Sequence, residues 1–335
     1  MKNPWIQSAR LRTLPLAISG ILLGIVLSKM HHHQHLGISV LAILTATLLQ
    51  ILSNYANDYG DFQKGTDSKA GRQDRMLTTG SISESSMKKA LYFLGALTFV
   101  LGTIMIVWSY QLHLISSNGL GYFMAIGIVA IFSAIAYTVG KNAYGYLGLG
   151  DLFVFVFFGL VPVIGTAILL GCELNSSFGF AAAGMGFLST AVLNTNNYRD
   201  IESDKESHKN TFPTRIGARW TLFYHRLLLL FGFLGIFIAM VNHVEHLLNA
   251  SAVNSKNSLW DFNNSQNYLL VMMIFGVFSP VAILLSQHFS DLKRLKPGDR
   301  ENINPQLKKL SLSTLLFVVL FGVLGMFVDG WFYGA

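Results

Sequence analysis

Residues 147–171 read LGLGDLFVFVFFGLVPVIGTAILLG and contain a single charged side chain, that of Asp151. A helix of this length is long enough to cross the hydrocarbon core of a bilayer, which is about 30 Å thick. A helix that is apolar on all sides cannot face water along its circumference. The segment therefore predicts a membrane-spanning helix.

Eight further apolar runs of similar length occur along the chain of 335 residues. Hydrophobic residues make up 52% of the chain and charged residues 12%, against about 25% charged in a soluble domain. This composition excludes a soluble enzyme and a disordered chain. It predicts an all-α polytopic membrane protein, with nine transmembrane helices in a bundle around a central cavity and one integral membrane domain over residues 1–335. The predicted spans are 12–29, 38–56, 89–109, 120–138, 147–171, 178–195, 220–241, 268–287 and 311–332.

The basic residues are divided unequally between the two ends of these spans. With nine spans, 21 of the 24 Lys and Arg residues fall at the N-terminus or in the loops after the even-numbered spans. Only Lys29 and Lys256 fall on the other side, and Arg226 lies inside the seventh span. The positive-inside rule then predicts a cytoplasmic N-terminus. The net charge of +7 is accordingly explained by orientation in membrane lipid, with no soluble module to bind nucleic acid.

Two related polar motifs close the second and the sixth spans. Residues 57–61 read NDYGD and residues 196–200 read NNYRD, 139 residues further along the chain. Each copy begins while the chain is still at the end of an apolar run, on the predicted cytoplasmic side. The pattern indicates a degenerate internal repeat, in which two similar helical halves face each other.

The spacing of the acidic residues suggests a metal site. If the second span continues one turn, Asn57 and Asp61 share a helix face; Asn196, Asp200 and Asp204 are spaced in the same way. Two such carboxylate groups would repel each other unless a cation lay between them. Magnesium suits them, because it binds carboxylate oxygens and completes its shell with substrate phosphates. The basic residues that would meet the remaining phosphate charge are Lys64, Arg72, Arg75, Lys205, Lys209 and Arg215. In the simpler alternative, both motifs are solvated loops in which Asp offsets Lys and Arg.

At this point the sequence resembles the UbiA-type intramembrane aromatic prenyltransferases. Those proteins have nine transmembrane helices and two aspartate-rich motifs, after helices two and six, that hold a magnesium-bound prenyl diphosphate. Within the family, the branch that acts on 1,4-dihydroxy-2-naphthoate in menaquinone synthesis is the most similar. The motifs that carry the resemblance are RTLP at 12–15, NDYGDF at 57–62 with Gly65 and Asp67, GYLGLGD at 145–151, and NNYRD at 196–200 with Asp204.

The resemblance implies transfer of a polyprenyl group from polyprenyl diphosphate to 1,4-dihydroxy-2-naphthoate, with loss of CO2 and diphosphate, to give demethylmenaquinol. It assigns Asp58, Asp61 and Asp67 to one Mg2+ and Asp200 and Asp204 to another. The general family pattern has an aspartate where this chain has Gly65, and the naphthoate branch uses Asp67 instead. Residues 71–75 depart from the family pattern, because they lack a Gly-Pro pair that relatives often carry there.

The resemblance also implies a set of substrate-binding residues. Lys141 and Arg72 would hold the diphosphate, with Tyr137 four residues before the lysine. Asp151 would lie near the aromatic substrate or act only as a helix N-cap. Arg12 would pair with the substrate carboxylate or act only as a membrane anchor. The remaining predicted contacts are Asn57, Asn196 and Asn197 as neutral oxygen ligands, Lys64, and the tyrosines Tyr59, Tyr137, Tyr146 and Tyr198 as cation-stabilising rings or interfacial anchors.

Two other functions stay open at the level of sequence. Prenylation of another aromatic acceptor, such as 4-hydroxybenzoate, would use the same fold and metal. A secondary transporter can also carry repeated polar motifs within its spans, although both motifs here lie at one membrane face. The predicted location is the bacterial cytoplasmic (inner) membrane, with the active site facing the cytoplasm. On the opposite side, residues 31–35 (HHHQH) suggest either a divalent metal site or a solvated loop.

Overall fold

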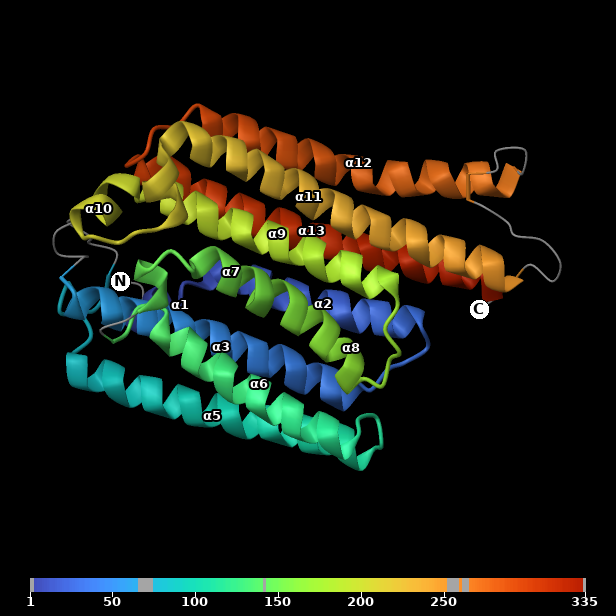
Figure 1. The fold of residues 1–335 in the computed structure, drawn as a ribbon, viewed down its shortest axis with the longest axis horizontal. Helices are drawn as coiled ribbons and strands as arrows, with labels where there is room; N and C mark the ends of the chain where they lie inside the picture. Colours follow the sequence, from blue (N-terminus) through green and yellow to red (C-terminus); the bar gives the residue numbers. More distant parts are fainter. Residues whose placement is uncertain (1–2, 66–74, 141–142, 252–258, 261–264, 334–335) are drawn as a thin grey trace.

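The computed structural model describes residues 3–65, 75–140, 143–251, 259–260 and 265–333, and within these ranges it contains helices and no strand (Figure 1). Nine helical segments in this part of the chain are long and apolar enough to cross a membrane, which confirms the nine predicted spans. The helices are α1 (Pro4–Ala9), α2 (Leu14–Met30), α3 (Leu36–Gln63), α5 (Glu84–Gln111), α6 (Ser117–Ala136), α7 (Gly150–Phe155), α8 (Thr166–Leu169), α9 (Ser176–Arg199), α10 (Ile201–Glu206), α11 (Phe212–Ser251), α12 (Ser265–Lys293) and α13 (Arg300–Tyr333).

The local sequence explains where several of these helices begin. Ser83, Ser116 and Asn175 precede α5, α6 and α9, and each side chain accepts a hydrogen bond from a backbone N–H of the first turn. Between these caps the chain is apolar, so its backbone groups must be satisfied within the segment, and a helix does this. The fifth span is composite, because a π-helical segment, Val156–Gly165, joins α7 to α8. Pro162 lies inside that segment and has no N–H to donate.

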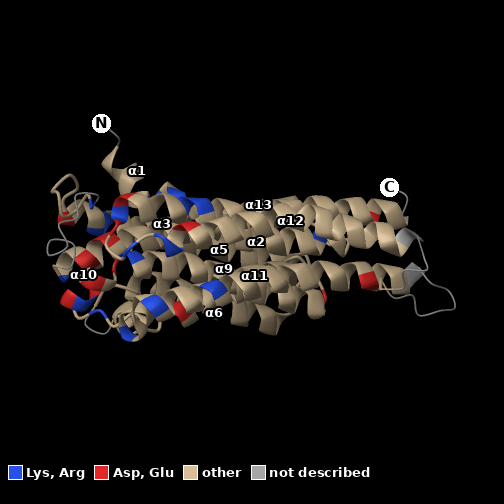
Figure 2. Cartoon of the chain, turned by 90° about the horizontal axis from the view of Figure 1, so that it is seen from above, with Lys and Arg blue, Asp and Glu red and all other residues tan. Residues whose placement is uncertain are grey.

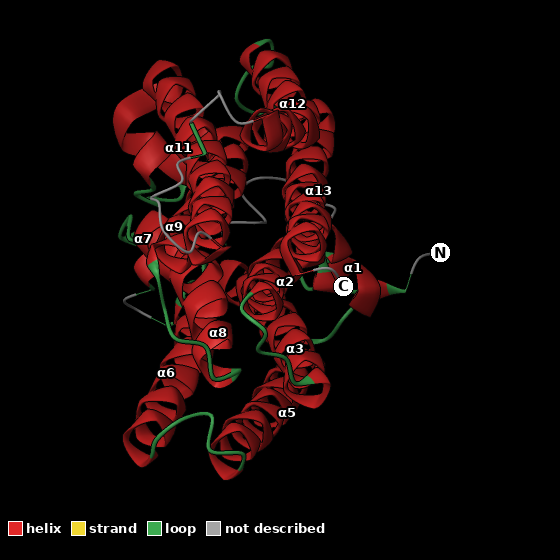
Figure 3. Cartoon of the chain, turned by 90° about the vertical axis from the view of Figure 1, so that its right-hand side faces the viewer, coloured by secondary structure: helices red, strands yellow, loops and turns green. Residues whose placement is uncertain are grey.

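Seen end-on, the helices form two rows (Figure 3). One row contains α6, α8, α9 and α11, and the other contains α5, α3, α2 and α13. Contacts between α5 and α6 close the ring at one edge, and contacts of α12 with α11 and α13 close it at the other. The central helix α9 is the most buried of the candidate spans, whereas few residues of α5 and α6, at the edge of the bundle, are fully buried. A small residue permits close packing at the centre: a Cβ at Gly184 of α9 would lie 2.8 Å from the backbone nitrogen of Ile236 in α11.

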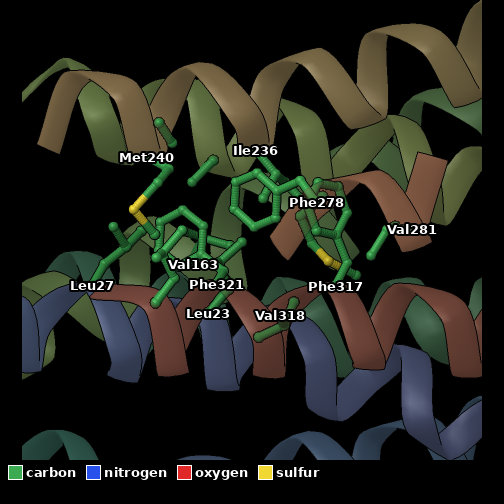
Figure 4. Close-up of a cluster of buried hydrophobic side chains, with 14 of the residues drawn as sticks. Leu23, Leu27, Val163, Ile236, Met240, Phe278, Val281, Phe317, Val318 and Phe321 are labelled. Atoms are coloured by element: carbon green, nitrogen blue, oxygen red, sulfur yellow. The ribbon is translucent and has the colours of Figure 1, made fainter. Parts of the chain in front are cut away.

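The main apolar core joins the C-terminal helices to α2 (Figure 4). The rings of Phe278 in α12 and Phe317 in α13 meet edge to face, with their centroids 5.1 Å apart. Leu23 and Leu27 of α2 pack into the same cluster and are fully buried. The same cluster contains Met185 of α9 and Ile236 of α11, so the core joins the two rows of helices.

Charged residues gather at one end of the bundle (Figure 2). This end carries α10 and the ends of α3 and α9, where the two acidic motifs lie. The helix α3 continues to Gln63, as the spacing of its motif predicted, whereas α9 ends at Arg199 and a separate short helix, α10, begins at Ile201. The bundle therefore has one polar end, and both motifs belong to it.

Candidate active site

A cavity opens between the two rows of helices at the polar end. It encloses about 1250 Å³ of space, including its opening to the outside. Its polar wall includes Arg12, Asn57 and Asn196, and its deeper wall is apolar and aromatic, with Phe157 and Pro162 from the π-helical segment. A cavity of this form suits a ligand with a charged head and an apolar body.

The first acidic motif is buried at the end of α3, beside this cavity. Asp58 is 1% exposed, and one of its carboxylate oxygens accepts a hydrogen bond from the hydroxyl of Ser8 in α1. Asp61 accepts a hydrogen bond of 2.9 Å from the hydroxyl of Tyr146, and its other oxygen lies 3.3 Å from the guanidinium of Arg75. Buried carboxylates require such partners, because an isolated charge in a low-dielectric interior is costly.

Gly60, within the same motif, is needed for a close helix approach. A Cβ at this position would lie 2.6 Å from the carbonyl oxygen of Thr138, at the end of α6. The hydroxyl of Thr138 in turn donates to the backbone oxygen of Ala56 and to the side-chain oxygen of Asn57. The close approach therefore holds Asn57 in place at the cavity.

The second acidic motif lies at the break between α9 and α10. Both oxygens of Asp200 accept hydrogen bonds from the guanidinium of Arg199, at 3.0 and 2.6 Å, and the Nε of Arg300 lies 3.6 Å away. Asp204 is also buried, and one of its oxygens lies 3.8 Å from the Nζ of Lys209. The expected continuous helix face across this motif is therefore interrupted at Asp200, where the backbone leaves the regular helix.

Lys209 joins the two motifs electrostatically. Its ammonium group lies near Asp204, interacts with Asp61, and is 5.3 Å from the ring centroid of Tyr146. Burial acts to lower the pKa of Lys209, but the negative charges of Asp204 and Asp61 raise it, and the net shift is upward. The Nζ of Lys64 lies 3.6 Å from the centroid of the same ring. The two lysines and Tyr146 form a cationic patch next to the aspartates.

The internal repeat places equivalent residues on one cavity. Asn57 and Asn196 occupy the same position in the two copies of the motif, and both line the cavity. The side-chain oxygen of Asn196 accepts a hydrogen bond of 2.6 Å from Arg199. This arrangement agrees with two similar halves that face each other across the site.

The other predicted site residues fall into four groups. Arg12 and Tyr137 line the cavity, and burial raises the pKa of Tyr137 to about 12, so its hydroxyl stays protonated. Asp151 lies in the first turn of α7 and accepts a hydrogen bond of 2.9 Å from Tyr224. Tyr198 points to the α12–α13 connection, where its hydroxyl donates to Leu295, and Asn197 is buried near the end of α9. Asp67, Arg72 and Lys141 lie outside the described residues.

Some residues of the site had no signal in the sequence. Ser8 reaches Asp58 because Arg10 turns the chain between α1 and α2, in the first span, with a φ of 47°. Tyr144 lines the cavity and stacks on Phe153, with 4.0 Å between ring centroids. Arg300 comes from the start of α13, about 100 residues after the motif it contacts. Only a tertiary structure brings these side chains to the motifs.

The donor atoms of the polar end suit Mg2+. Asp58, Asp61, Asp200 and Asp204 supply carboxylate oxygens, and Asn57 supplies an amide oxygen at the cavity. Oxygen ligands of this kind are those that Mg2+ selects in proteins. In the described ranges no three His, Cys, Asp or Glu side chains are already arranged around one point that a metal ion could occupy.

The histidines at the opposite end of the bundle form a separate cluster. The ring of His31, at the end of α2, lies 5.5 Å from that of His243 and 5.9 Å from that of His246, both in α11. His243 also contacts Asp329 of α13 at 2.9 Å. Burial, together with the neighbouring histidines, lowers the pKa of His31 to about 4. The cluster therefore joins α2, α11 and α13 at the end of the bundle opposite the acidic motifs, with a neutral imidazole at His31.

We expect acidification to weaken this histidine cluster. The unfolded chain binds a proton at His31 below its ordinary pKa of 6.5, whereas the folded chain excludes it until about pH 4. The free energy of unfolding should therefore fall as the pH decreases between these values. His31→Gln should reduce the loss of Tm between pH 7.5 and pH 5 by about 2 °C, a modest figure since His31 is partly exposed. His35→Gln is the control in the same loop, and an equal loss of Tm in all three proteins would contradict the prediction.

Comparison with known proteins agrees with this architecture. The UbiA prenyltransferase family profile matches residues 17–254. The chain is 36% identical over 322 residues to the 1,4-dihydroxy-2-naphthoate octaprenyltransferase of Haemophilus influenzae, covering 95% of this chain and 94% of the relative. It is 35% identical over 332 residues to the enzyme of that name from Escherichia coli, covering 98% and 96%.

Solved structures share the fold. A UbiA homologue from Archaeoglobus fulgidus, solved with GPP and Mg2+, aligns with a TM-score of 0.57 at 14% identity and covers 95% of this chain and 99% of that one. The apo UbiA homologue from Aeropyrum pernix aligns with a TM-score of 0.54 at 14% identity, covering 95% and 96%. With a family match over most of the chain and relatives aligned from end to end, this integral membrane protein belongs to the UbiA prenyltransferase family.

Proposed function

We propose that the protein transfers a polyprenyl group from polyprenyl diphosphate to 1,4-dihydroxy-2-naphthoate, releasing CO2 and diphosphate and giving demethylmenaquinol. The observation that carries the proposal is a cavity with an apolar body whose polar wall, with Asn57 and Asn196, lies beside the buried aspartates of both motifs. The names of the relatives that align along almost the whole chain support the choice of acceptor. The family profile and these relatives confirm that the chain belongs to the UbiA family, as its motifs predicted.

The diphosphate binds at the polar end. Lys209 and Lys64 present ammonium groups there, and both lie close to the ring of Tyr146. Burial lowers the pKa of Lys64, so its charge is the more readily lost of the two at alkaline pH. Arg72 and Lys141 remain proposed diphosphate contacts, on the sequence pattern alone.

Magnesium is the proposed cofactor. Asp58, Asp61 and Asp67 would hold one ion, and Asp200 and Asp204 the other, with Asn57, Asn196 and Asn197 as neutral oxygen ligands or substrate contacts. The structural neighbour from Archaeoglobus fulgidus was solved with a prenyl diphosphate and Mg2+. When bound, the metal neutralises negative charge on the departing diphosphate.

The residues of the cavity then control the allylic C–O bond cleavage. The lysines stabilise the electron pair that leaves with the diphosphate oxygen. Tyr137 and Tyr144 meet edge to face, with centroids 5.3 Å apart, and present aromatic surface to the cationic allylic carbon. The apolar wall around Phe157 keeps water from capturing that carbon.

The acceptor binds between this carbon and the N-terminal arginines. Arg12 and Arg10 both line the cavity, and a guanidinium can hold the substrate carboxylate through two parallel hydrogen bonds. The ring carbon that bears the carboxylate forms the new bond to the allylic carbon. The electron pair of the bond to the departing CO2 returns to the ring and restores its aromaticity. Asp151 and Tyr198 remain proposed contributors near this substrate and near the second motif.

The location follows from the same proposal. The polar end faces the cytoplasm of a bacterial cell, because most basic residues lie there, and the N-terminus is on that side of the inner membrane. The water-soluble acceptor, the naphthoate, and the water-soluble product, diphosphate, then exchange with the cytoplasm. The polyprenyl chain remains in membrane lipid.

The proposal is tested by product analysis. Purified protein with Mg2+ and octaprenyl diphosphate is incubated with equal concentrations of 1,4-dihydroxy-2-naphthoate and 4-hydroxybenzoate. The masses of the products are then measured by mass spectrometry. We expect a prenylated naphthol that has lost the carboxylate. A product of 4-hydroxybenzoate that keeps its carboxylate would move the protein to another acceptor, and no product from either would contradict the proposed reaction.

A further inference from the structure

One basic residue of the seventh span has no part in the proposed reaction. Arg226 is the one Lys or Arg between Trp220 and Asn249 of the helix α11. That helix has no Asp or Glu before Glu245, near its far end. A charge within a membrane span is costly, so such a side chain either pairs with another group or reaches toward the interface. Arg226 therefore needs a partner that α11 itself does not supply.

Arg226 belongs to a row of exposed side chains. Intervals of four, three and four residues place the row on one face of α11, and it consists of Arg219, Phe223, Arg226 and Leu230. Trp220 lies beside this row, and its ring meets that of Phe223 edge to face, with the centroids 5.8 Å apart. These five residues form the α11 stripe, which combines two guanidinium groups with exposed aromatic and aliphatic surface.

Neither arginine of the α11 stripe has a side-chain partner among the described residues. The helix α10 packs against α11, yet its exposed acids Glu202 and Glu206 form no ion pair with either arginine. The buried arginines at the same end of the bundle, Arg75 and Arg199, are each paired with an aspartate. The positive charge of the stripe is therefore not compensated within the described part of the chain.

The contact of α11 with α9 gives the level of the stripe in the bundle. A Cβ at Gly232 would lie 2.6 Å from the Cγ of Leu188, and the two helices run in opposite directions (Figure 1). Arg226, six residues before Gly232, is thus level with Asn194, which precedes the second acidic motif by two residues. Arg219 lies about 10 Å nearer the polar end, at 1.5 Å per residue. The stripe therefore runs from the polar end into the apolar part of the span.

We propose that the α11 stripe binds the phosphate group of an anionic phospholipid, such as phosphatidylglycerol. Each guanidinium can pair with phosphate oxygens through two parallel hydrogen bonds. The long side chain of Arg226 extends toward the headgroups, where Trp220 marks the interface. The acyl chains of the lipid then cover Phe223 and Leu230. This site lies on the lipid-facing surface of the bundle and is independent of the proposed function.

A phospholipid suits the stripe better than a phosphate ion or a second protein chain. Phe223 and Leu230 flank Arg226 on the exposed face, so the site faces hydrocarbon, which a free ion does not enter. Two guanidinium groups favour a headgroup with a net negative charge, whereas a choline headgroup brings a cation of its own. A protein partner would have to place carboxylates inside the membrane, where they are rare.

Native mass spectrometry of the full chain in detergent tests the proposal. The dissociation constant of the first bound lipid is measured for phosphatidylglycerol and for phosphatidylcholine with the same acyl chains. Wild-type protein should bind phosphatidylglycerol about 10-fold more tightly, and Arg219→Gln or Arg226→Gln should each weaken that binding about fivefold. The double variant should bind both lipids equally. Arg226→Lys keeps the charge and should retain much of the preference.

Lys308→Gln is the control for this measurement, because Lys308 is exposed at the same end of the bundle on α13. It should leave the preference for phosphatidylglycerol within about twofold of the wild type. The Tm of the arginine variants without lipid should equal that of the wild type, since both side chains are exposed. A wild-type protein without lipid preference, or arginine variants that bind as Lys308→Gln does, would overturn the proposal.

The same samples distinguish the other occupants. Glycerol 3-phosphate should not displace phosphatidylglycerol, and efficient displacement would show that the stripe recognises a free phosphate ion. A wild-type dimer that the double variant loses, with unchanged lipid affinity, would assign the stripe to a second copy of the chain. Either result would overturn the proposal.

A second experiment uses the protein in liposomes. Phosphatidylglycerol with a photoreactive group on its headgroup is irradiated with the wild-type protein and with the double variant, and the labelled peptides are mapped. We expect label within residues 216–230 of the wild type and its loss from the double variant. Label spread evenly over the basic loops, and equal in both proteins, would show general attraction to an anionic surface and would overturn the assignment of a site.

Discussion

Asp61→Asn should lower kcat/KM of the prenyl transfer by about 10³-fold, the largest single effect that the structure predicts. The substitution keeps the shape of the side chain and removes its charge. Asp61 is buried, accepts a hydrogen bond from Tyr146, and contacts Arg75 and Lys209 electrostatically. Loss of its charge weakens a proposed Mg2+ ligand and leaves the positive charges of Arg75 and Lys209 without this partner. Each preorganised group of this kind contributes about 10²–10³-fold to the rate.

The measurement is the steady-state rate at several Mg2+ concentrations. The apparent KM for Mg2+ should rise along with the loss of kcat, which a merely structural role of Asp61 would not produce. Asp291→Asn is the control, since Asp291 is exposed at the same end of the bundle and pairs with Lys309, away from the cavity. If Asp61→Asn kept activity within threefold of the wild type with unchanged Mg2+ dependence, the metal assignment would be wrong.

The sequence was sufficient for the spans and for the first acidic motif because both depend on local patterns. A run such as 147–171 has no alternative in a membrane, where a helix satisfies every backbone group. The continuation of α3 to Gln63 follows from the same 3.6-residue period, and it places Asn57 and Asp61 on one side as expected.

Other features of the site depend on the tertiary fold. The backbone break at Asp200 divides the second motif between α9 and α10, although its spacing resembled that of the first. Ser8 and Arg300 contact the motifs from opposite ends of the chain. Contacts between distant segments are therefore what the sequence did not specify.

Lys209→Met should lower kcat/KM by about 10²–10³-fold, and this loss should appear mainly in the use of the diphosphate. Among the described lysines, Lys209 interacts with carboxylates of both motifs: it forms an ion pair with Asp204 and interacts electrostatically with Asp61. A neutral side chain leaves those carboxylates closer to mutual repulsion and removes a cation from the leaving group. Because the carboxylates raise the pKa of Lys209, its charge persists through alkaline pH, so the basic limb of the rate profile should not report its deprotonation.

Lys209→Arg and Lys205→Met separate charge from structure. Removing one partner of a buried ion pair also destabilises a protein, so a lower rate alone would not prove a role in diphosphate binding. Lys209→Arg retains the charge and should recover most of the rate, while Lys205→Met, at an exposed position one turn earlier, should stay near wild type. Inhibition by inorganic diphosphate measures the affinity of the diphosphate site directly. The inhibition constant should rise at least 10-fold in Lys209→Met and stay unchanged in Lys205→Met. Equal inhibition constants in these two variants would place Lys209 outside the diphosphate site and leave it as a structural link between the two motifs.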